Sequence, residues 1–375
     1  MIHLVAAEDR TGYLSALRKT WCEFDLELKT MPVKSSLSEA RTEIAHSFFQ
    51  DTLLDQITAV RPKLPSIRGY GIFAVDGDQL ELPASADILA AGYRGFPCKN
   101  DQETHFPRMY YTAKVEVFSG IAVDVRQSEK NDECKNAVEM AREAHPGSIT
   151  LYDRLHFSLE LAEAHEASKS RFIARLKTGT RVLLQLQEFI ASKRRAKRVK
   201  IGDLFIRFLR VKNPKTKEWM YLGTNLPRGA FKIREIQWLY WRRYDIETVF
   251  RDLTSTHSLG VWHSSKINGI LQEFYLQFYV HNASRFLILI QGGIEVIKDI
   301  KKGEYRRPNF KLIREYYFEN LKLLIQKKAD QFMDGIKALI EKSWEVRTYF
   351  ARISPRQVKS TRNTYASASL VSRRP

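Results

Sequence analysis

The strongest constraint on the fold is an alternation of strand-like and helix-like segments between residues 70 and 176. Short runs rich in β-branched and aromatic residues, bounded by turn residues, predict strands, and helical periodicity predicts two helices among them. Ser119-Gly120 predicts a hairpin turn. Strands that can pair antiparallel, followed by helix, strand, helix and strand, predict an α/β domain with a mixed sheet. The predicted strands are 71–75, 79–82, 108–118, 121–125, 148–152 and 171–176, and the predicted helices are 133–145 and 159–167.

The segments around this core have other patterns, which divide the chain into regions. Helical periodicity marks both ends of the chain, and β-like runs interrupt the alternation in the middle. The predicted helices are 10–28, 38–57, 271–289 and 312–339, and the β-like runs are 181–189, 200–211 and 218–225. The predicted regions are a helical N-terminal domain (1–65), the first part of the α/β core (66–177), a β-rich insertion (178–228), the second part of the core (229–300), a C-terminal helical region (301–353) and a basic flexible tail (354–375).

The charge balance indicates the kind of partner. Lys and Arg number 61 against 43 Asp and Glu, which gives a net charge of +18 over 375 residues. Such an excess favours a polyanionic partner, and nucleic acid is the commonest. Cys22, Cys98 and Cys134 are too scattered for a zinc site, which predicts reduced thiols. We see no secretory signal, and polar residues interrupt the most apolar stretch, 274–297, so we expect a soluble cytoplasmic protein without a membrane partner.

One segment, 240–254, carries a polar face suited to phosphate and metal chemistry. Tyr240, Arg243 and Glu247 are three and four residues apart, so a helix returns them to one face. The carboxylate can ligate a metal, and the guanidinium and phenol can hold a phosphate. An ordinary surface ion pair between Arg243 and Glu247 is the alternative interpretation.

Two further carboxylates follow predicted strands. Asp76 follows 71–75 and Asp153 follows 148–152, so both are expected at one edge of the sheet, where open α/β folds place their sites. If Glu247 packs over that edge, three carboxylates meet, and divalent cations such as Mg²⁺ must neutralise them. Two such ions can activate a water or a 3′ hydroxyl for displacement at phosphorus. The alternative is that Asp76 is a turn residue and Asp153 a helix cap, with Asp78 and Asp124 also available as acids.

Basic residues outside this segment are candidate DNA contacts. A dense cluster lies within the predicted insertion, and Lys266 follows the 240–254 helix. A DNA-backbone contact is our first interpretation, and a solvated hairpin loop is the alternative. The residues of the cluster are Lys193, Arg194, Arg195, Lys197 and Arg198.

In this order, the motifs around Asp76, Asp153, 221–227 and 240–254 resemble those of bacterial DDE transposases of the insertion-sequence-four type. The family pattern Tyr-x2-Arg-x3-Glu-x6-Lys maps onto Tyr240, Arg243 and Glu247, but its last position is Thr254 here. The resemblance spans roughly residues 36 to 290.

The resemblance implies an RNase H-like core with the β-rich insertion between the second Asp and the Glu. It implies that Asp76, Asp153 and Glu247 bind Mg²⁺, for which Mn²⁺ can substitute, and that Tyr240 and Arg243 hold a phosphate of the cleaved strand. The implied activity is cleavage at terminal inverted repeats and transfer of the 3′ ends to target DNA. A DNA-bound homodimer, a bacterial nucleoid location and an aromatic wedge among Trp219, Trp238 and Trp241 are also implied.

Two alternatives compete with this expectation. Thr254 in place of Lys is consistent with a transposase derivative that binds DNA without cleaving it. A two-metal nuclease without strand transfer uses the same carboxylates. Both alternatives remain open at the level of the sequence.

Overall fold

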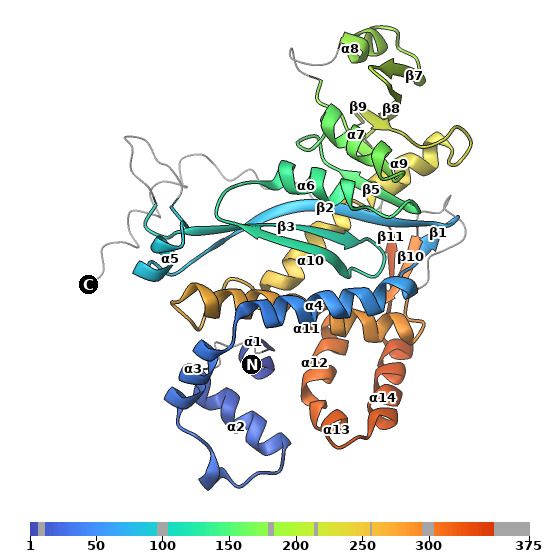
Figure 1. Ribbon diagram of the computed structural model, residues 1–375. Coiled ribbons are helices and arrows are strands. Elements are labelled where there is room, and N and C mark those ends of the chain that lie inside the picture. The colour runs from blue at the N-terminus through green and yellow to red at the C-terminus, as the bar shows by residue number, and fades with distance from the viewer. Residues whose placement is uncertain are drawn as a thin grey trace, which may run out of the picture.

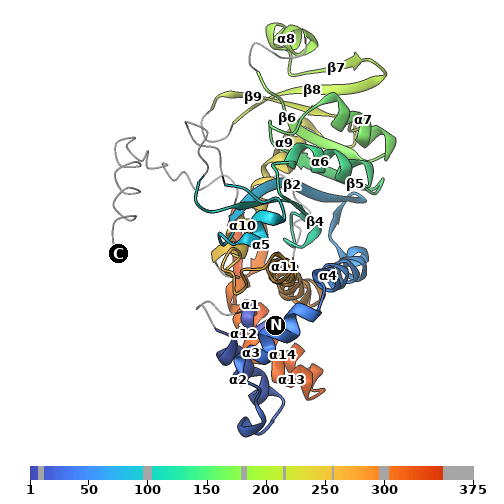
Figure 2. The same ribbon diagram turned by 60° about the vertical axis from the view of Figure 1, so that its left-hand side comes forward.

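A computed structural model describes residues 1–6, 12–95, 104–178, 184–213, 217–255, 257–294 and 304–348. Among these residues a nine-stranded sheet forms the centre, with helices on both faces (Figures 1 and 2). Its strands are β1 (Ser66–Ile67), β2 (Tyr70–Glu81), β3 (Arg108–Glu116), β4 (Ala122–Ser128), β5 (Ser148–Tyr152), β6 (Arg171–Arg175), β7 (Ala196–Ile201), β8 (Leu204–Lys212) and β9 (Trp219–Thr224). A separate hairpin pairs β10 (Glu304–Pro308) with β11 (Trp344–Thr348).

The helices surround this sheet. They are α1 (Ile2–Ala6), α2 (Tyr13–Glu23), α3 (Lys34–Glu43), α4 (His46–Val60), α5 (Ala86–Ala90), α6 (Glu133–Arg142), α7 (Leu159–Ala167), α8 (Leu184–Ala191), α9 (Ile233–Trp241), α10 (Tyr244–Ser255), α11 (Ile267–Ile290), α12 (Phe310–Glu319), α13 (Leu321–Ile325) and α14 (Ala329–Lys342). Short 3₁₀ turns cover Leu28–Thr30 and Arg61–Lys63. None of the helices in the described ranges is long and apolar enough to cross a membrane.

The strand order confirms the predicted mixed α/β fold. The sheet runs β4-β3-β2-β5-β6-β9-β8-β7. In it β2, β3 and β4 form an antiparallel meander, and β5 and β6 lie parallel to β2. Strands β4, β3, β2, β5 and β6 therefore form the predicted mixed sheet of the core. Strands β9, β8 and β7 then extend the same sheet, because β9 pairs antiparallel with β6.

Two apolar layers hold the sheet in place. Neighbouring residues of β2 face opposite sides, so Ala74 contributes to the core shared with α4, α9, α10 and α11, whereas Val75 contributes to the core shared with α6, α7 and α8. Phe274 and Phe172 are completely buried on these two sides. Each such side chain contributes about 1.5–3 kcal/mol on burial. Figure 1 shows α6 and α7 on one face of the sheet and α10 and α11 on the other.

The predicted hairpin turn at Ser119-Gly120 is confirmed. Gly120 has φ +72°, a left-handed conformation that glycine adopts without strain. The buried Glu116 carboxylate closes the turn, because it accepts hydrogen bonds from the N–H groups of Phe118 and Ser119 and from the Ser119 hydroxyl. The turn thus satisfies its own polar groups within the core.

Several predicted elements were wrong in extent. The strands predicted at 71–75 and 79–82 form one strand, β2, because β3 pairs with it continuously from Phe73 to Glu81. The predicted helix 38–57 is split into α3 and α4, and 312–339 is split into α12, α13 and α14, with Lys327 at φ +58° in the last break. Figure 1 shows α12 and α14 side by side, which a continuous helix prevents.

One run was assigned to the wrong class. Residues 184–189, predicted as β-like, belong to α8, whose Leu186 and Phe189 pack into the same core as residues of β7 and β8. Burial of one helical face decided the outcome over β-propensity. The tail 354–375 and Cys98 lie outside the described residues.

The N-terminal helices are bound to α11 by buried polar contacts. Arg41 of α3 forms an ion pair of 2.8 Å with Glu273, and both side chains are almost fully buried. The Asn268 side chain accepts a hydrogen bond from the N–H of His46, at the start of α4. The Gln56 side chain donates to the carbonyl of Tyr279. Helix α4 therefore packs along the second part of the core, although it is distant from α11 in sequence.

Candidate active site

Asp76 lies within β2, and Asp153 directly follows β5, the neighbouring parallel strand. Strand β2 pairs with β5 in the register Gly71 to Ser148 through Ala74 to Leu151. Two residues further on, this register brings Asp76 level with Asp153. Asp153 directly follows the last residue of β5, whereas β2 continues to Glu81. The expectation that Asp76 ends its strand was therefore wrong, because β3 carries β2 past the point where β5 stops.

Glu133 and His156 lie beside Asp76. One ligand atom from each of the three residues lies within 4.8 Å of the other two. The Gly77 N–H donates to Glu133 at 3.1 Å, and His156 Nε2 lies 3.0 Å from the same carboxylate oxygen. A Cβ at position 77 would lie 2.7 Å from Glu133 Cγ, so glycine allows this close approach. Neither Glu133 nor His156 is among the residues predicted from the sequence.

The pKa values of the two carboxyl groups in this cluster are shifted in opposite directions. Burial raises the pKa of Asp76 to about 6; the Arg243 guanidinium opposes this rise, and the Glu133 carboxylate adds to it. Burial alone would raise the pKa of Glu133, but its contacts with His156 and the Gly77 N–H lower it overall. Two carboxylates so close together disfavour ionisation of both unless a positive charge is present.

Arg243 connects Asp76 to Glu247. Its Nη1 lies 3.4 Å from Asp76 Oδ2 and its Nη2 3.3 Å from Glu247 Oε1. The Arg243 side chain is 5% exposed, whereas that of Glu247 is 51% exposed. Burial lowers the pKa of Arg243, but Tyr240, Asp153 and Asp76 outweigh burial and raise it overall. Arg243 is thus within electrostatic reach of all three predicted carboxylates.

The predicted helix 240–254 is not continuous. Helix α9 ends at Trp241 and α10 begins at Tyr244, so Arg242 and Arg243 form a turn between them. The turn lets the two adjacent arginines reach different partners: Arg242 lies over the Trp238 ring, and Arg243 reaches the carboxylates. Tyr240 therefore belongs to one helix and Glu247 to the next. Local periodicity does not encode this break.

Tyr240 is completely buried, in contrast to the exposed position expected for a DNA contact. Its hydroxyl has no hydrogen-bond partner among the described residues. Burial raises the pKa of Tyr240; Arg243 opposes this rise and Asp153 adds to it. Tyr240 thus lies close to Arg243 and Asp153, with its side chain buried in the core.

The remaining predicted contacts lie elsewhere. Thr254 bonds to its own helix, since its hydroxyl donates to the carbonyl of Phe250 at 3.0 Å. Lys266 precedes α11 and faces a cavity of about 360 Å³ whose lining includes Tyr13 and Asp87 but none of the three carboxylates.

The basic cluster of the insertion surrounds the start of β7. The exposed Lys193, Arg194 and Arg195 lie between α8 and β7, and Lys197 and Arg198 are on β7 itself. Lys197 forms an ion pair of 3.6 Å with Glu188 of α8. The five basic residues are therefore not equivalent, because Lys197 is paired with an acid and Lys193, Arg194 and Arg195 are exposed.

A cavity adjoins Asp153 at the carboxylate edge of the sheet. Its volume is about 640 Å³, and its lining includes Arg175, Lys177 and Trp219. Trp219 is 49% exposed and stacks under Arg210, whereas Trp238 and Trp241 are buried. Of the three tryptophans considered from sequence, only Trp219 has an accessible ring, beside an acid and two cations.

Residues 67–283, more than half of the chain, match the family described as "Transposase DDE domain". Among solved structures, the chain is similar to a piggyBac transposase in a synaptic complex with hairpin DNA. That similarity has 11% sequence identity and a TM-score of 0.45, and it covers 90% of this chain and 69% of that chain. No protein of curated function matches the sequence.

Proposed function

Because this chain belongs to the family of transposases with a DDE domain, we propose that it cleaves DNA at the terminal inverted repeats of a mobile element. The freed 3′ ends are then joined to target DNA. Asp76, Asp153 and Glu247 are the proposed catalytic residues. The observation that supports this assignment is the register of β2 and β5, which brings Asp76 level with Asp153, together with the Arg243 contacts to Asp76 and Glu247. The insertion-sequence-four type is the proposed subgroup.

The donor atoms fit a hard divalent cation. Carboxylate oxygens are the preferred protein ligands of Mg²⁺, and an imidazole nearby is also compatible with Mn²⁺. We propose that Asp76, Asp153 and Glu247 hold Mg²⁺, and that Glu133 and His156 position Asp76. Bound ions of this kind activate a water or a 3′ hydroxyl and stabilise the leaving oxygen.

The chain's own residues orient the phosphate and the acids. In the proposed complex the Arg243 guanidinium holds the backbone phosphate beside the cleaved bond, and its two contacts keep Asp76 and Glu247 close together. Tyr240, which is buried, acts through Arg243 as a positioning residue. Trp219 is the proposed wedge for an unstacked base, because its exposed ring lines the cavity beside Asp153.

The other regions have proposed roles in assembly. Region 1–65 contacts the element's ends or mediates dimerisation, and two copies act together on DNA in the nucleoid of a bacterial cell. Lys266, Lys193, Arg194, Arg195, Lys197 and Arg198 are proposed contacts to the DNA backbone.

Cleavage of a duplex that carries the element's end tests the catalytic assignment. Wild-type protein with Mg²⁺ is expected to give nicked and joined products, and Asp76→Ala, Asp153→Ala and Glu247→Ala are expected to give none. The control Asp334→Ala removes an exposed acid on α14 and is expected to retain activity. Equal products from wild type and all three active-site variants contradict the proposal.

Thr254 supports one other function, that of a DNA-binding derivative without cleavage activity. Its side chain bonds to its own helix and offers no cation to a phosphate. That function predicts end-specific binding with no metal-dependent product. Products without joining to target DNA indicate a nuclease instead.

A further inference from the structure

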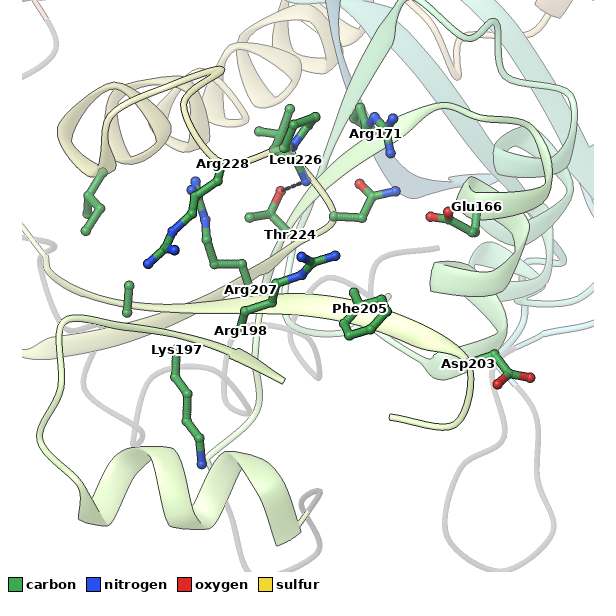
Figure 3. Close-up of a pocket in the computed structure, with 14 residues that line it drawn as sticks. Glu166, Arg171, Lys197, Arg198, Asp203, Phe205, Arg207, Thr224, Leu226 and Arg228 are labelled. Atoms are coloured by element: carbon green, nitrogen blue, oxygen red, sulfur yellow. Dashed lines mark hydrogen bonds between the residues drawn. The ribbon is translucent and has the colours of Figure 1, made fainter. Parts of the chain in front are cut away.

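A second basic site lies on the extension of the sheet formed by β7, β8 and β9. Arg198 on β7, Arg207 on β8 and Arg228 after β9 line a cavity of about 660 Å³ (Figure 3). The exposed ring of Phe205 also lines it. A cavity of this volume is in the range of sites that bind small groups.

Strand pairing places the first two arginines on one face. Arg198 lies directly opposite Arg207, and Arg207 lies directly opposite Thr224. Residues opposite each other in antiparallel strands share a face, and like charges in such positions destabilise the sheet. Lys197 alternates to the other face, where it pairs with Glu188. Figure 3 shows this difference: Arg198, Arg207 and Arg228 gather on one side of the strands, and Lys197 points away.

The positive charge of the three arginines is not neutralised by an acid in the described part of the chain. Two acids, Glu166 and Asp203, line the cavity, but neither forms an ion pair with these arginines. The Nε and Nη2 atoms of Arg207 are buried without a hydrogen-bond partner among the described residues. Burial lowers the pKa of Arg207, and the nearby Arg228 adds to this effect. An anion in the cavity gives the buried nitrogen atoms of Arg207 a hydrogen-bond acceptor. Its negative charge also offsets the repulsion between Arg207 and Arg228.

The loop that carries Arg228 is held in place. The Thr224 hydroxyl donates to the carbonyl of Phe172 and accepts from the Leu226 N–H at 3.1 Å. The Asn225 side chain accepts from the Phe172 N–H at 2.9 Å and donates to the carbonyl of Ser170 at 3.0 Å. The guanidinium of Arg228 therefore projects from an anchored backbone.

This cavity and the carboxylate edge lie at opposite ends of β6. Arg171, the first residue of β6, lines the basic cavity, whereas Arg175, its last residue, lines the cavity beside Asp153. Four steps along a strand span roughly 13 Å. That separation is shorter than one turn of B-DNA, which is about 34 Å long, so one duplex is long enough to contact residues at both ends of β6.

We propose that Arg198, Arg207 and Arg228 form a pocket that binds a phosphodiester of the DNA backbone, separate from the phosphate at the carboxylates. The inference rests on the proposed function only in the choice of DNA as the polyanion. The pocket anchors the duplex, and the chemistry takes place at the other end of β6.

Salt-dependent binding tests the pocket. A labelled duplex of arbitrary sequence is titrated with wild type and with Arg207→Ala/Arg228→Ala, and anisotropy is read over a range of salt concentrations. Removal of each arginine–phosphate interaction is expected to weaken binding about tenfold and to reduce the slope of log K against log salt by about 0.9. The matched control Lys337→Ala/Lys342→Ala removes two charges from α14 and is expected to match wild type. A double variant that also matches wild type overturns the proposal.

The single variant Arg228→Ala tests the pocket in a protein whose core is unchanged. Arg228 is an exposed loop residue, so Arg228→Ala leaves the core intact and is expected to give about half the change in slope; no change overturns the proposal. A separate arm uses inorganic phosphate. If phosphate raises the melting temperature of wild type but not of the double variant, while both bind the duplex equally, the pocket takes free phosphate and the DNA assignment is overturned.

The test is independent of catalysis. Duplex binding is measured without Mg²⁺, so the change in salt dependence is read whether or not wild type cleaves DNA. Where wild type cleaves, Arg207→Ala/Arg228→Ala is expected to retain kcat and raise KM.

Discussion

Lys114 is a buried ammonium whose cost to stability can be measured directly. It lies on β3, it is 7% exposed, and it forms no ion pair among the described residues. Its Nζ lies 5.2 Å from the centre of the Phe73 ring. Burial lowers the pKa of Lys114 to about 8; Asp124 and Glu143 oppose this, and Arg61 and Arg126 add to it.

The magnitude follows from the difference between the two pKa values. A change from 10.5 to about 8 corresponds to roughly 3 kcal/mol, at about 1.36 kcal/mol per pKa unit. Below a pH of about 8, both folded and unfolded chains carry the charge, so the full cost applies. Between about 8 and 10.5, the unfolded chain keeps a proton that the folded chain has released, so the stability contributed by this group rises with pH.

Lys114→Met removes the charge and keeps most of the side-chain volume. We expect the variant to be more stable than wild type by about 2–3 kcal/mol near pH 7, after allowance for removal of the cation–π interaction with Phe73. The difference should shrink by about 2 kcal/mol by roughly pH 9.5. Urea denaturation followed by tryptophan fluorescence at both pH values measures it. Lys130→Met, at an exposed position, is the control and should show neither effect. A Lys114→Met variant that is less stable than wild type at neutral pH, or whose advantage does not change with pH, refutes the reasoning.

Three further outcomes are expected. Arg41→Met should lower the free energy of unfolding by about 3–5 kcal/mol, because it leaves the buried Glu273 carboxylate without its cation; a urea midpoint equal to wild type contradicts this. Gly120→Ala should cost about 1–2 kcal/mol, because alanine is strained at the positive φ of the hairpin turn; calorimetry showing no loss excludes that strain. Adding Mg²⁺ at about ten times its Kd should stabilise wild type by about 1.4 kcal/mol, and chelation should reverse this. Asp76→Asn should show a smaller gain, and an equal gain in both proteins means that the ion binds elsewhere.

Local sequence patterns were sufficient to predict several elements of the core. The strand runs near 108–118 and 148–152 and the turn at Ser119-Gly120 were recognised because their signals lie within a few adjacent residues. The family match confirms a DDE transposase, which the resemblance of the motifs around Asp76, Asp153, 221–227 and 240–254 had suggested. Glu133 and His156 were missed, because neither stands in a strand-end position. His156 follows Asp153 by three residues, and that spacing was the only local signal for it.

The sequence by itself indicated several strands of the core, the helices near 133–145 and 159–167, the turn at Ser119-Gly120 and the large positive charge. Tertiary structure decided where they meet. Pairing with β3 carries β2 past Asp76, the parallel register with β5 leads towards Asp76 and Asp153 at the same level, and a turn at Arg242 and Arg243 separates Tyr240 from Glu247. Tertiary structure also decided where Arg198 and Lys197 lie, because pairing of β7 with β8 and packing of α8 place them on opposite faces. The physical reason is that register and burial depend on residues distant in sequence, whereas propensity and periodicity report only on near neighbours.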